Sequence, residues 1–563
     1  MFRKWLSLSL AFVLVLSLFT GCTSGSSSSN SDDPVSLTVY SQTANYSGEL
    51  TGWFAQELLE RFNVKINIIP DTEGVYSTRM ESGNLGDLVI WGTDGDDYKA
   101  AVEADLLFDW NEDGLLDEYG PYIKENMAAA LQKNMDISGG TLYGFGHNVA
   151  SSSNDIQKFF YTWDIRWDLY KELGYPEVKN LDDLIEVLAQ MKEIAPTDDA
   201  GNPTYAVSLW PDWDGSMVMY VKSMATAYYG YDELGMGLYN VDNGEFYGAL
   251  QENGPYLEML KFFNKLYQRN LLDPDSIVQT FDEVSAKVRN GGTFFSIFNF
   301  GGSDAYNSDT HMAENKMMLT FTPEEATPLV YGMNIFGSNR IWSIGSKTQY
   351  PELCMEIINW LSTPEGRMVS EHGPQEICWD YDEAGNTFTT ELGTLMHNYR
   401  KTKFPEDSGY YGEFNDGANQ MNNTTWAIDA MNPDSNGETY NWDSWKSNQT
   451  EAKNETESDW RDKTGAINAD SYLTSKSYKI ALGTTYSESR KSNELKVVWE
   501  QVKKALVDYS WKAMYAKTDK EFDIIVEQMV KTANDYGYDA CVEWSEGEAA
   551  ARKALEDKVR SGE

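Results

Sequence analysis

Short strands that alternate with helices constrain the fold of this chain more than any other feature. Apolar β-type runs occupy residues 37–40, 64–69 and 87–91. Between the first two runs, residues 54–62 carry a large apolar side chain at every fourth position, a spacing that predicts a helix. This alternation favours a parallel sheet, in which ligands bind beyond the carboxyl ends of the strands.

A second α/β pattern follows along the chain. Asn180 is suited to cap a helix whose apolar face lies within residues 181–191, and a strand is expected at residues 205–209. Two later apolar runs, residues 292–300 and 339–344, are also typical of buried strands. We expect both of these runs to return to the first unit.

In the C-terminal part of the chain, the sequence predicts helices and one long irregular stretch. Pro351 is placed to open a helix, and Thr518 with Glu521 forms a capping box before another. Residues 401–465 are rich in Asn, Asp, Ser, Thr and Gly, which is typical of long loops. The C-terminal part therefore consists of extra amphipathic helices beyond a loop region.

Length and charge exclude some classes of protein. A chain of 563 residues exceeds what one hydrophobic core usually serves, so at least two domains are expected. The 88 acidic and 45 basic residues give a formal net charge of −43. Such a surface repels phosphate backbones, which argues against a nucleic-acid partner.

The N-terminus predicts export and lipidation. Arg3 and Lys4 precede an apolar run at residues 8–19, which is short for a membrane span but suits a secretory signal. The sequence LFTGC that ends at Cys22 resembles the bacterial lipobox, although the lipobox usually has Leu at the position of Phe19. We therefore expect a signal peptide at residues 1–21, lipidation of Cys22, and a location on the extracellular face of the bacterial cytoplasmic membrane. An ordinary signal peptide with an incidental Cys is the alternative.

The residues after Cys22 and the other cysteines agree with an exported chain. Residues 22–34 are rich in Ser and form a tether with no means of packing. Only Cys354, Cys378 and Cys541 follow, with no CxxC motif, so neither a disulfide framework nor a zinc site is indicated. Pairing of Cys354 with Cys378 and two free buried thiols are both open.

Four stretches, taken in order, resemble a known family. They are RWDLYKELGYPEVKNLDDLIEVL at 166–188, TDDAGNPTYAVSLW at 197–210, the segment from PELCM to DEAGN at 351–386, and EFDIIVEQM at 521–529. Behind a lipobox, this order is similar to the family-1 extracellular solute-binding lipoproteins of the sugar-binding type, which serve ABC importers. The resemblance implies a two-lobed, periplasmic-binding-protein-like α/β fold with a hinge between the lobes. It also implies a monomer that binds carbohydrate and delivers it to ABC permease subunits.

The resemblance also suggests how the chain divides. We expect the first lobe at residues 35–146, with residues 286–345 returning to it. The second lobe is expected at residues 147–285 together with residues 346–563, which include the loops and the C-terminal helices.

No catalytic residue is predicted. The four His residues lie outside any HExxH motif, and neither GxSxG, a P-loop nor GxGxxG is found. The family is not enzymatic, so we expect a binding protein. The length of the chain and its many aromatic residues favour an oligosaccharide as the ligand. The alternatives are a surface glycan-binding or adhesion lipoprotein without a transporter, and a lipoprotein glycoside hydrolase.

One acidic loop has the spacing of a calcium site. Asp109, Asn111, Asp113 and Asp117 match ligand positions of a calcium loop, with Gly114 at its turn. The twelfth position, where a bidentate Glu is expected, is Gly120. A structural calcium ion and a solvated acidic turn are both open, and no other cofactor is expected.

Aromatic residues in loops carry the prediction of a ligand site. Sugar rings pack their C–H faces on flat aromatic side chains and bond their hydroxyls to planar acid, amide or Arg groups. Residues with these properties lie where loops should face the ligand: Trp91, Tyr161, Trp163, Trp210, Asp212, Trp213, Asn299, Asn339, Arg340, Trp342 and Trp379. Two Trp and two Asp within residues 210–214 make this the strongest candidate. For each Trp, a place in a core is the alternative.

Overall fold

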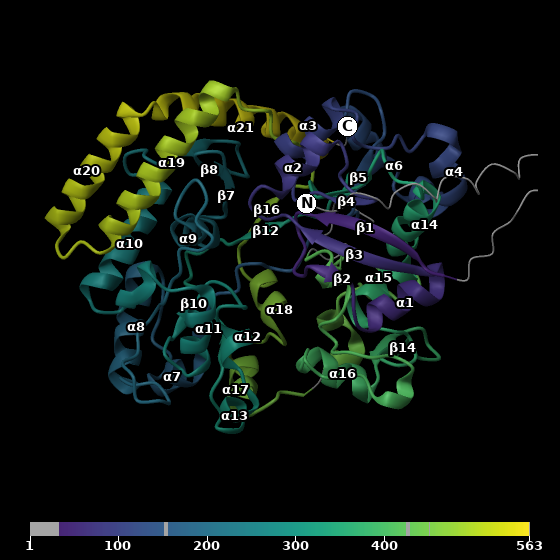
Figure 1. Cartoon of the computed structure of the whole chain (residues 1–563). Helices are drawn as coiled ribbons and strands as arrows, with labels where there is room; N and C mark the ends of the chain where they lie inside the picture. The colour runs from purple at the N-terminus through teal and green to yellow at the C-terminus, as the bar shows by residue number, and fades with distance from the viewer. Residues whose placement is uncertain (1–32, 151–155, 424–427, 450, 562–563) are drawn as a thin grey trace, which may run out of the picture.

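The computed structural model describes residues 33–150, 156–423, 428–449 and 451–561. The predicted signal peptide, Cys22 and most of the tether lie outside these residues. Within the described part of the chain, every helix is too short or too polar to cross a membrane. The chain folds into two lobes, each with its own hydrophobic core (Figure 1).

A mixed sheet of six strands forms the centre of the first lobe. Its order is β2-β3-β1-β4-β13-β5. The strands are β1 (Val35–Ser41), β2 (Gly48–Glu49), β3 (Val64–Pro70), β4 (Leu88–Ile90), β5 (Gly144–Gly146) and β13 (Ile341–Ile344). Strands β1, β3 and β4 run parallel, as the alternation of strands and helices predicts, whereas β2, β5 and β13 pair in the antiparallel sense.

Both faces of this sheet are covered, because side chains alternate along each strand. Leu88 and Ile90 of β4 pack in the hydrophobic cluster on one face of the sheet, while Val89 packs in a smaller cluster on the other face. Helices of the lobe are α1 (Trp53–Phe62), α2 (Val75–Ser82), α3 (Asp96–Glu103), α4 (Leu115–Tyr119), α5 (Pro121–Asn126), α6 (Ala128–Ile137), α14 (Pro351–Ser362), α15 (Pro364–His372) and α16 (Glu391–Asn398). Shorter elements are β14 (Trp379–Tyr381), β15 (Thr387–Thr389) and the 3-10 helices η1 (Glu112–Gly114), η3 (Glu406–Ser408), η4 (Ala418–Gln420), η5 (Trp442–Ser444) and η6 (Lys446–Asn448).

Small sheets and many helices build the second lobe. In one sheet, strand β6 (Asp164–Arg166) lies between β10 (Phe295–Ser296) and β11 (Met318–Thr320). A meander consists of β7 (Tyr231–Leu234), β8 (Gly237–Asn240) and β9 (Phe246–Gly248). In a third sheet, β12 (Leu329–Tyr331) pairs with β16 (Lys479–Ala481). The helices are α7 (Trp167–Glu172), α8 (Leu181–Ile194), α9 (Met219–Tyr229), α10 (Pro255–Gln268), η2 (Pro274–Ile277), α11 (Phe281–Arg289), α12 (Ser303–Tyr306), α13 (Asp309–Ala313), α17 (Glu455–Thr464) and α18 (Ala469–Thr474).

Three long helices complete the second lobe. They are α19 (Asn493–Met514), α20 (Asp519–Asp535) and α21 (Tyr538–Ser561), and they form an arch over this lobe (Figure 1). The apolar face of α19, with Trp499, Val502 and Leu506, is part of the core of the second lobe. The extra C-terminal helices are therefore integral to the lobe.

The two cores divide the chain differently from the predicted boundaries. Of residues 286–345, only the end returns to the first sheet, as β13, while Phe294 and Met318 lie in the core of the second lobe. Residues 351–445 were expected in the second lobe, but Ile357 and Trp445 are buried in the first. The physical reason is that α14 follows β13 closely and buries its apolar face on the same sheet.

Some expected strands are shorter than the sequence indicates. Residues 205–209 form only isolated bridges, Tyr205 with Thr293 and Val207 with Leu272. The apolar run at 292–300 contains a strand of two residues, β10. Cys354, Cys378 and Cys541 are free and buried, which answers the question of pairing left open by the sequence.

Ion pairs tie the lobes together at two places. Arg490 and Lys496, at the start of the C-terminal arch, pair with Asp96 of α3 in the first lobe, Lys496 at 2.5 Å. On another side, the backbone N–H of Lys158 donates to Asp429 and its Nζ pairs with Asp443.

Candidate functional site

An aromatic surface on the second lobe is the first candidate. Trp213 is 48% exposed and Phe160 is 49% exposed, although both are large aromatic residues. Phe300 lies between them, with its ring centroid 5.8 Å from that of Trp213 and 5.9 Å from that of Phe160. Phe281 packs on Trp213 at 4.9 Å. We call Phe160, Trp213, Phe281 and Phe300 the aromatic patch.

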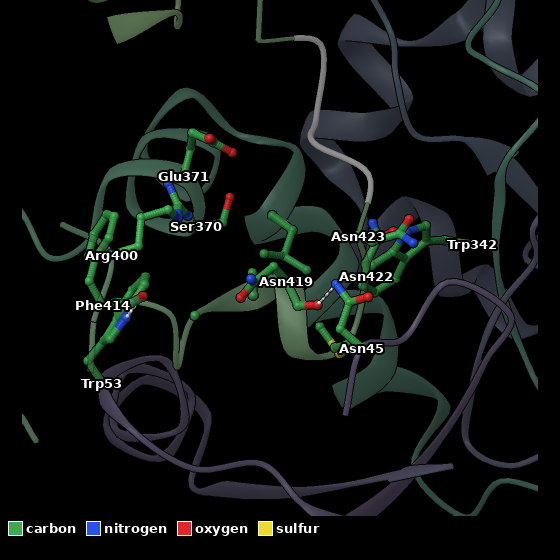
Figure 2. Close-up of a pocket in the computed structure, with 14 residues that line it drawn as sticks. Asn45, Trp53, Trp342, Ser370, Glu371, Arg400, Phe414, Asn419, Asn422 and Asn423 are labelled. Atoms are coloured by element: carbon green, nitrogen blue, oxygen red, sulfur yellow. Dashed lines mark hydrogen bonds between the residues drawn. The ribbon is translucent and has the colours of Figure 1, made fainter. Parts of the chain in front are cut away.

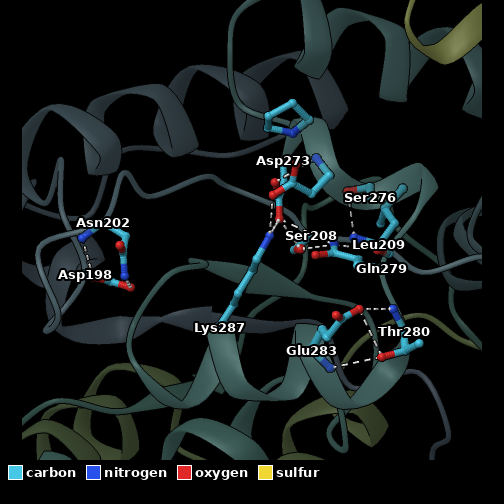
Figure 3. A network of polar contacts seen from close by, with 12 residues as sticks. Asp198, Asn202, Ser208, Leu209, Asp273, Ser276, Gln279, Thr280, Glu283 and Lys287 are labelled. Carbon is cyan, nitrogen blue, oxygen red and sulfur yellow. Dashed lines mark hydrogen bonds and ion pairs between the residues drawn. The ribbon is translucent and has the colours of Figure 1, made fainter.

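A buried polar network holds this patch in place (Figure 3). Gln279 donates to the carbonyl of Leu209 at 2.7 Å, and Ser276 accepts the N–H of Leu209, so the chain is fixed just before Trp210. Burial alone would raise the pKa of Asp273, but hydrogen bonds from Lys287 and Ser208 lower it overall. The carboxylate is therefore charged and bonded at the centre of the network.

The beginning of α11 positions the other side of the patch. Thr280 and Glu283 form a capping box that fixes the first turn of the helix, where Phe281 lies. Asp212 accepts the backbone N–H of Phe281 at 3.1 Å and so ties the loop of Trp213 to this helix. Trp210 is fully buried beneath Trp213, with their ring centroids 5.2 Å apart.

A cavity in the first lobe is the second candidate. Its volume is about 330 Å³, within the usual range of small-ligand sites. Figure 2 shows the amide side chains of Asn45, Asn419, Asn422 and Asn423 along it, with Glu371 and Arg400 at the opposite end. Trp53, Trp342 and Phe414 add aromatic surface. We call this space the asparagine cavity.

Hydrogen bonds from neighbouring strands and loops shape the asparagine cavity. The Ser41 hydroxyl, at the carboxyl end of β1, donates to the carbonyl of Met421 at 2.8 Å. Thr43 donates to Asn422 at 3.0 Å, and Asn45 donates to the carbonyl of Asn419. The cavity thus lies where the parallel strands end, which is the position that this fold class favours for ligands.

Charged groups lie at both ends of the cavity. Burial raises the pKa of Glu371, and the charge of Arg400 only partly opposes this effect. Arg400 bonds Asn415 at 3.1 Å and packs over the ring of Phe414. At the other end, Arg340 donates from Nη1 to Asn423 at 3.0 Å, and burial lowers the pKa of its guanidinium.

Several tryptophans predicted at the ligand site lie in cores instead. Trp91, Trp163 and Trp379 are almost fully buried. Their indole N–H groups donate to the Ser343 hydroxyl, the Ala227 carbonyl and the Gly373 carbonyl, respectively. Their rings are packed in cores and their N–H groups already donate to the protein, so these three Trp residues are core residues, which was the alternative for each.

The other predicted residues are divided between the two candidates and the surface. Trp210, Tyr161 and Trp342 are buried; Trp210 supports Trp213, Tyr161 packs on Phe160, and Trp342 lines the asparagine cavity. Asn299 donates to Asp304 at 2.9 Å. Asn339 is exposed, and Arg340 bonds a residue of the cavity wall.

The acidic loop at residues 109–117 does not gather metal ligands in this conformation. Asp109 accepts the N–H of Asn111, and Asp117 pairs with Lys124 at 2.6 Å. Asp113 has a left-handed backbone, with φ of 52°. Across the described residues, three or more His, Cys, Asp or Glu side chains are nowhere arranged to hold a metal ion.

Sequence reasoning missed most of the asparagine cavity. The cavity draws on residues 417–423, where GANQMNN offers four amide side chains within seven positions, and three of these, Asn419, Asn422 and Asn423, line the cavity. That run is a signal that could have indicated a polar binding surface. Phe281 and Phe160 were missed because Phe residues in sequence resemble core material.

The sequence and the fold of this chain resemble those of known proteins. A sequence model of the family described as bacterial extracellular solute-binding protein matches residues 47–368, more than half of the chain. The chain belongs to this family. The lipoprotein LipO of Bacillus subtilis is 24% identical over 283 residues, which are 49% of this chain and 52% of LipO. The match thus spans about half the length of that relative.

Solved structures with the same two-lobed fold match this solute-binding protein over nearly its whole length. The alginate-binding protein AlgQ2 has a TM-score of 0.59 at 14% identity, covering 92% of this chain and 98% of AlgQ2. FusA, an ABC-transporter substrate-binding protein of S. pneumoniae in complex with kestose, has a TM-score of 0.56 at 14% identity, covering 92% of this chain and 99% of FusA.

Proposed function

We propose that this solute-binding protein captures an oligosaccharide outside the cell and delivers it to an ABC importer. The observation that carries the proposal is the half-exposed Trp213 within a rigid aromatic patch. Large exposed aromatic surfaces are costly in water, and a sugar ring covers such a surface with its C–H face. AlgQ2 is named as an alginate-binding protein and FusA was solved with kestose, which makes carbohydrate the solute to test first.

The asparagine cavity supplies the polar half of recognition. Amide groups both donate and accept hydrogen bonds, which matches the hydroxyls of a sugar. Two separate candidate surfaces, one on each lobe, suit a ligand of more than one sugar unit. This is why we propose an oligosaccharide.

Closure of the lobes is the proposed mechanism. A ligand that contacts both lobes stabilises the closed arrangement by its difference in affinity for the two states. The permease then binds the closed, loaded form. The ties between Lys158 and Asp443 and between Lys496 and Asp96 are the contacts that such a motion would rearrange.

Anchoring completes the proposal. Lipidation at Cys22 would hold the receptor beside its permease, and the Ser-rich residues up to 34 would let it reach the transporter. Neither lobe is proposed to perform chemistry on the sugar.

The test is a thermal-shift screen of the full chain in detergent against neutral and acidic oligosaccharides. A ligand that binds only the folded state raises the melting temperature with the logarithm of its concentration. We expect a rise with one glycan family, and chromatography should recover that glycan intact. Turnover of the glycan would indicate a hydrolase, and a panel without any shift would argue against a carbohydrate receptor.

Trp213→Ala then examines the patch itself. We expect at least about tenfold weaker binding, or about 1.4 kcal/mol, with an unchanged melting temperature because the ring is half exposed. Tyr536→Ala is the matched control, since Tyr536 is 45% exposed at the end of α20 and outside the patch. A lower melting temperature with unchanged affinity would make Trp213 a structural residue.

A further inference from the structure

More than half of the arginines among the described residues pair with carboxylates, as the acidic composition predicts. With 88 acidic and 45 basic residues, a cation that needs a partner readily finds one. Arg61, Arg166, Arg269 and Arg552, for example, each lie within 3 Å of a Glu or Asp oxygen.

Arg340, beside the asparagine cavity, belongs to the arginines without such a partner. Among the described residues, no carboxylate lies within ion-pair distance of its guanidinium, and its side-chain hydrogen bond goes to the neutral Asn423. Burial lowers its pKa, with no acid acting in the opposite direction. A partly desolvated cation without a counter-charge costs free energy that an anionic ligand would recover.

The position of Arg340 connects it to the cavity. It directly precedes β13, whose Trp342 lines the cavity, and its partner Asn423 is part of the cavity wall. The hydrogen bond to Asn423 uses Nη1. Nε and Nη2 make no hydrogen bond to the described residues. The edge that they form matches the two oxygens of a carboxylate.

The opposite end of the cavity contains charges of both signs, although Arg400 is not within ion-pair distance of an acid among the described residues. Arg400 lies beside Glu371, whose pKa its charge lowers against the effect of burial. At the Arg340 end, the polar side chains that line the cavity are amides, namely Asn45, Asn422 and Asn423. The excess positive charge thus lies at one end, where a single acid group would be received.

We propose that the ligand is an acidic oligosaccharide and that Arg340 binds the carboxylate of one of its uronate units at the rim of the asparagine cavity. This inference rests on the proposed function, because it names the class of glycan. Neighbouring sugar hydroxyls bond the amides of the cavity, and the aromatic patch takes another unit.

The experiment uses a matched pair of ligands, trigalacturonate and its methyl ester, which share a backbone and differ in charge. Uronate trimers of other sugars and neutral trimers extend the panel. Calorimetry with the full chain in detergent should show a uronate bound at least about tenfold more tightly than its ester. Added salt should weaken binding of the acid and leave that of the ester unchanged.

Variants separate charge from folding. Arg340→Gln should lower affinity for the acid about tenfold and change affinity for the ester less than about twofold. Arg289→Gln is the control, because Arg289 is exposed and far along the chain on α11. Arg340→Lys keeps the positive charge but lacks the two parallel N–H donors of a guanidinium. It should therefore retain only part of the preference for the acid over its ester.

The outcomes are distinct. Equal or tighter binding of the neutral ligand overturns this inference and leaves the proposed function intact. Binding of neither class overturns both. An acid preference that survives Arg340→Gln in a folded variant assigns the carboxylate to another residue and also overturns the inference.

Discussion

A buried pair of histidines should make the first lobe sensitive to acid. The Nε2 of His372 lies 2.7 Å from the carbonyl of Tyr440, which can only accept, so this nitrogen carries a proton. In the neutral ring, Nδ1 must then accept, and it lies 3.1 Å from Nε2 of His397. His397 stacks on Trp442 at 4.6 Å, and His372 packs against Trp445. The pair therefore fastens the loop region to α15 and α16.

Protonation opposes this arrangement. Burial lowers the pKa of His372 to about 4, and burial together with the neighbouring His372 lowers that of His397 to about 2. Arg400 also disfavours a charge on either ring, whereas Asp443 favours one on His372. A proton on Nδ1 of His372 would face the N–H of His397, so their hydrogen bond would be lost.

The magnitude follows from linkage. Each histidine has an ordinary pKa near 6.5 when unfolded, so between pH 6.5 and its lowered pKa the unfolded chain binds more protons than the folded chain. Stability is complete above pH 6.5 and falls with pH by about 1.4 kcal/mol per unit and per histidine. At pH 4.5 the two histidines together would cost about 5 kcal/mol, a large share of a typical stability of about 5–15 kcal/mol.

Urea denaturation followed by tryptophan fluorescence measures this effect. Between pH 6.5 and 4.5, the free energy of unfolding of the wild type should fall by about 5 kcal/mol more than that of His372→Gln/His397→Gln. The other titrating groups are present in both proteins, so their contributions cancel in this difference. Glutamine keeps a donor for the Tyr440 carbonyl. Equal pH slopes for the two chains would refute the reasoning, since the histidines would then titrate alike in both states.

Two further predictions concern the N-terminus and the acidic loop. Cys22→Ser should move the protein from the membrane fraction to the soluble fraction of cells, as fractionation and immunoblotting would show; retention in the membrane would contradict lipidation at this residue. Calcium at about 1 mM should leave the melting temperature unchanged, because Asp117 is already paired with Lys124. A rise that Asp117→Asn abolishes would establish a calcium ion in the loop.

Local signals predicted the elements better than they predicted their partners. Asn180 caps α8 as expected, accepting the N–H groups of Asp182 and Asp183. Thr518 caps α20 by accepting the N–H of Glu521, although the Glu521 side chain bonds Lys517 instead of closing the box on Thr518. Caps depend on three or four neighbouring residues, so the sequence contains all that is needed.

The assignment of segments to lobes failed for the opposite reason. Phe294 and Ile341 both lie in strand-like runs, yet they pack in different lobes. Which sheet receives a strand depends on pairings hundreds of positions apart, which periodicity does not encode. The same limit applies to the site: Trp213 and Trp163 have similar aromatic surroundings in sequence, but one is half exposed and the other fully buried.

The hydrogen bond from Ser41 to the carbonyl of Met421 has a consequence for the order of folding. These residues are 380 positions apart, yet the bond between them holds Met421 in the wall of the asparagine cavity. During synthesis, β1 emerges long before the residues that complete its lobe, and loop closure over such a distance is slow. Neither lobe can finish its core before the chain has passed residue 445. A chain built in this way stays unfolded for much of its synthesis, which is the state that a secretory channel accepts.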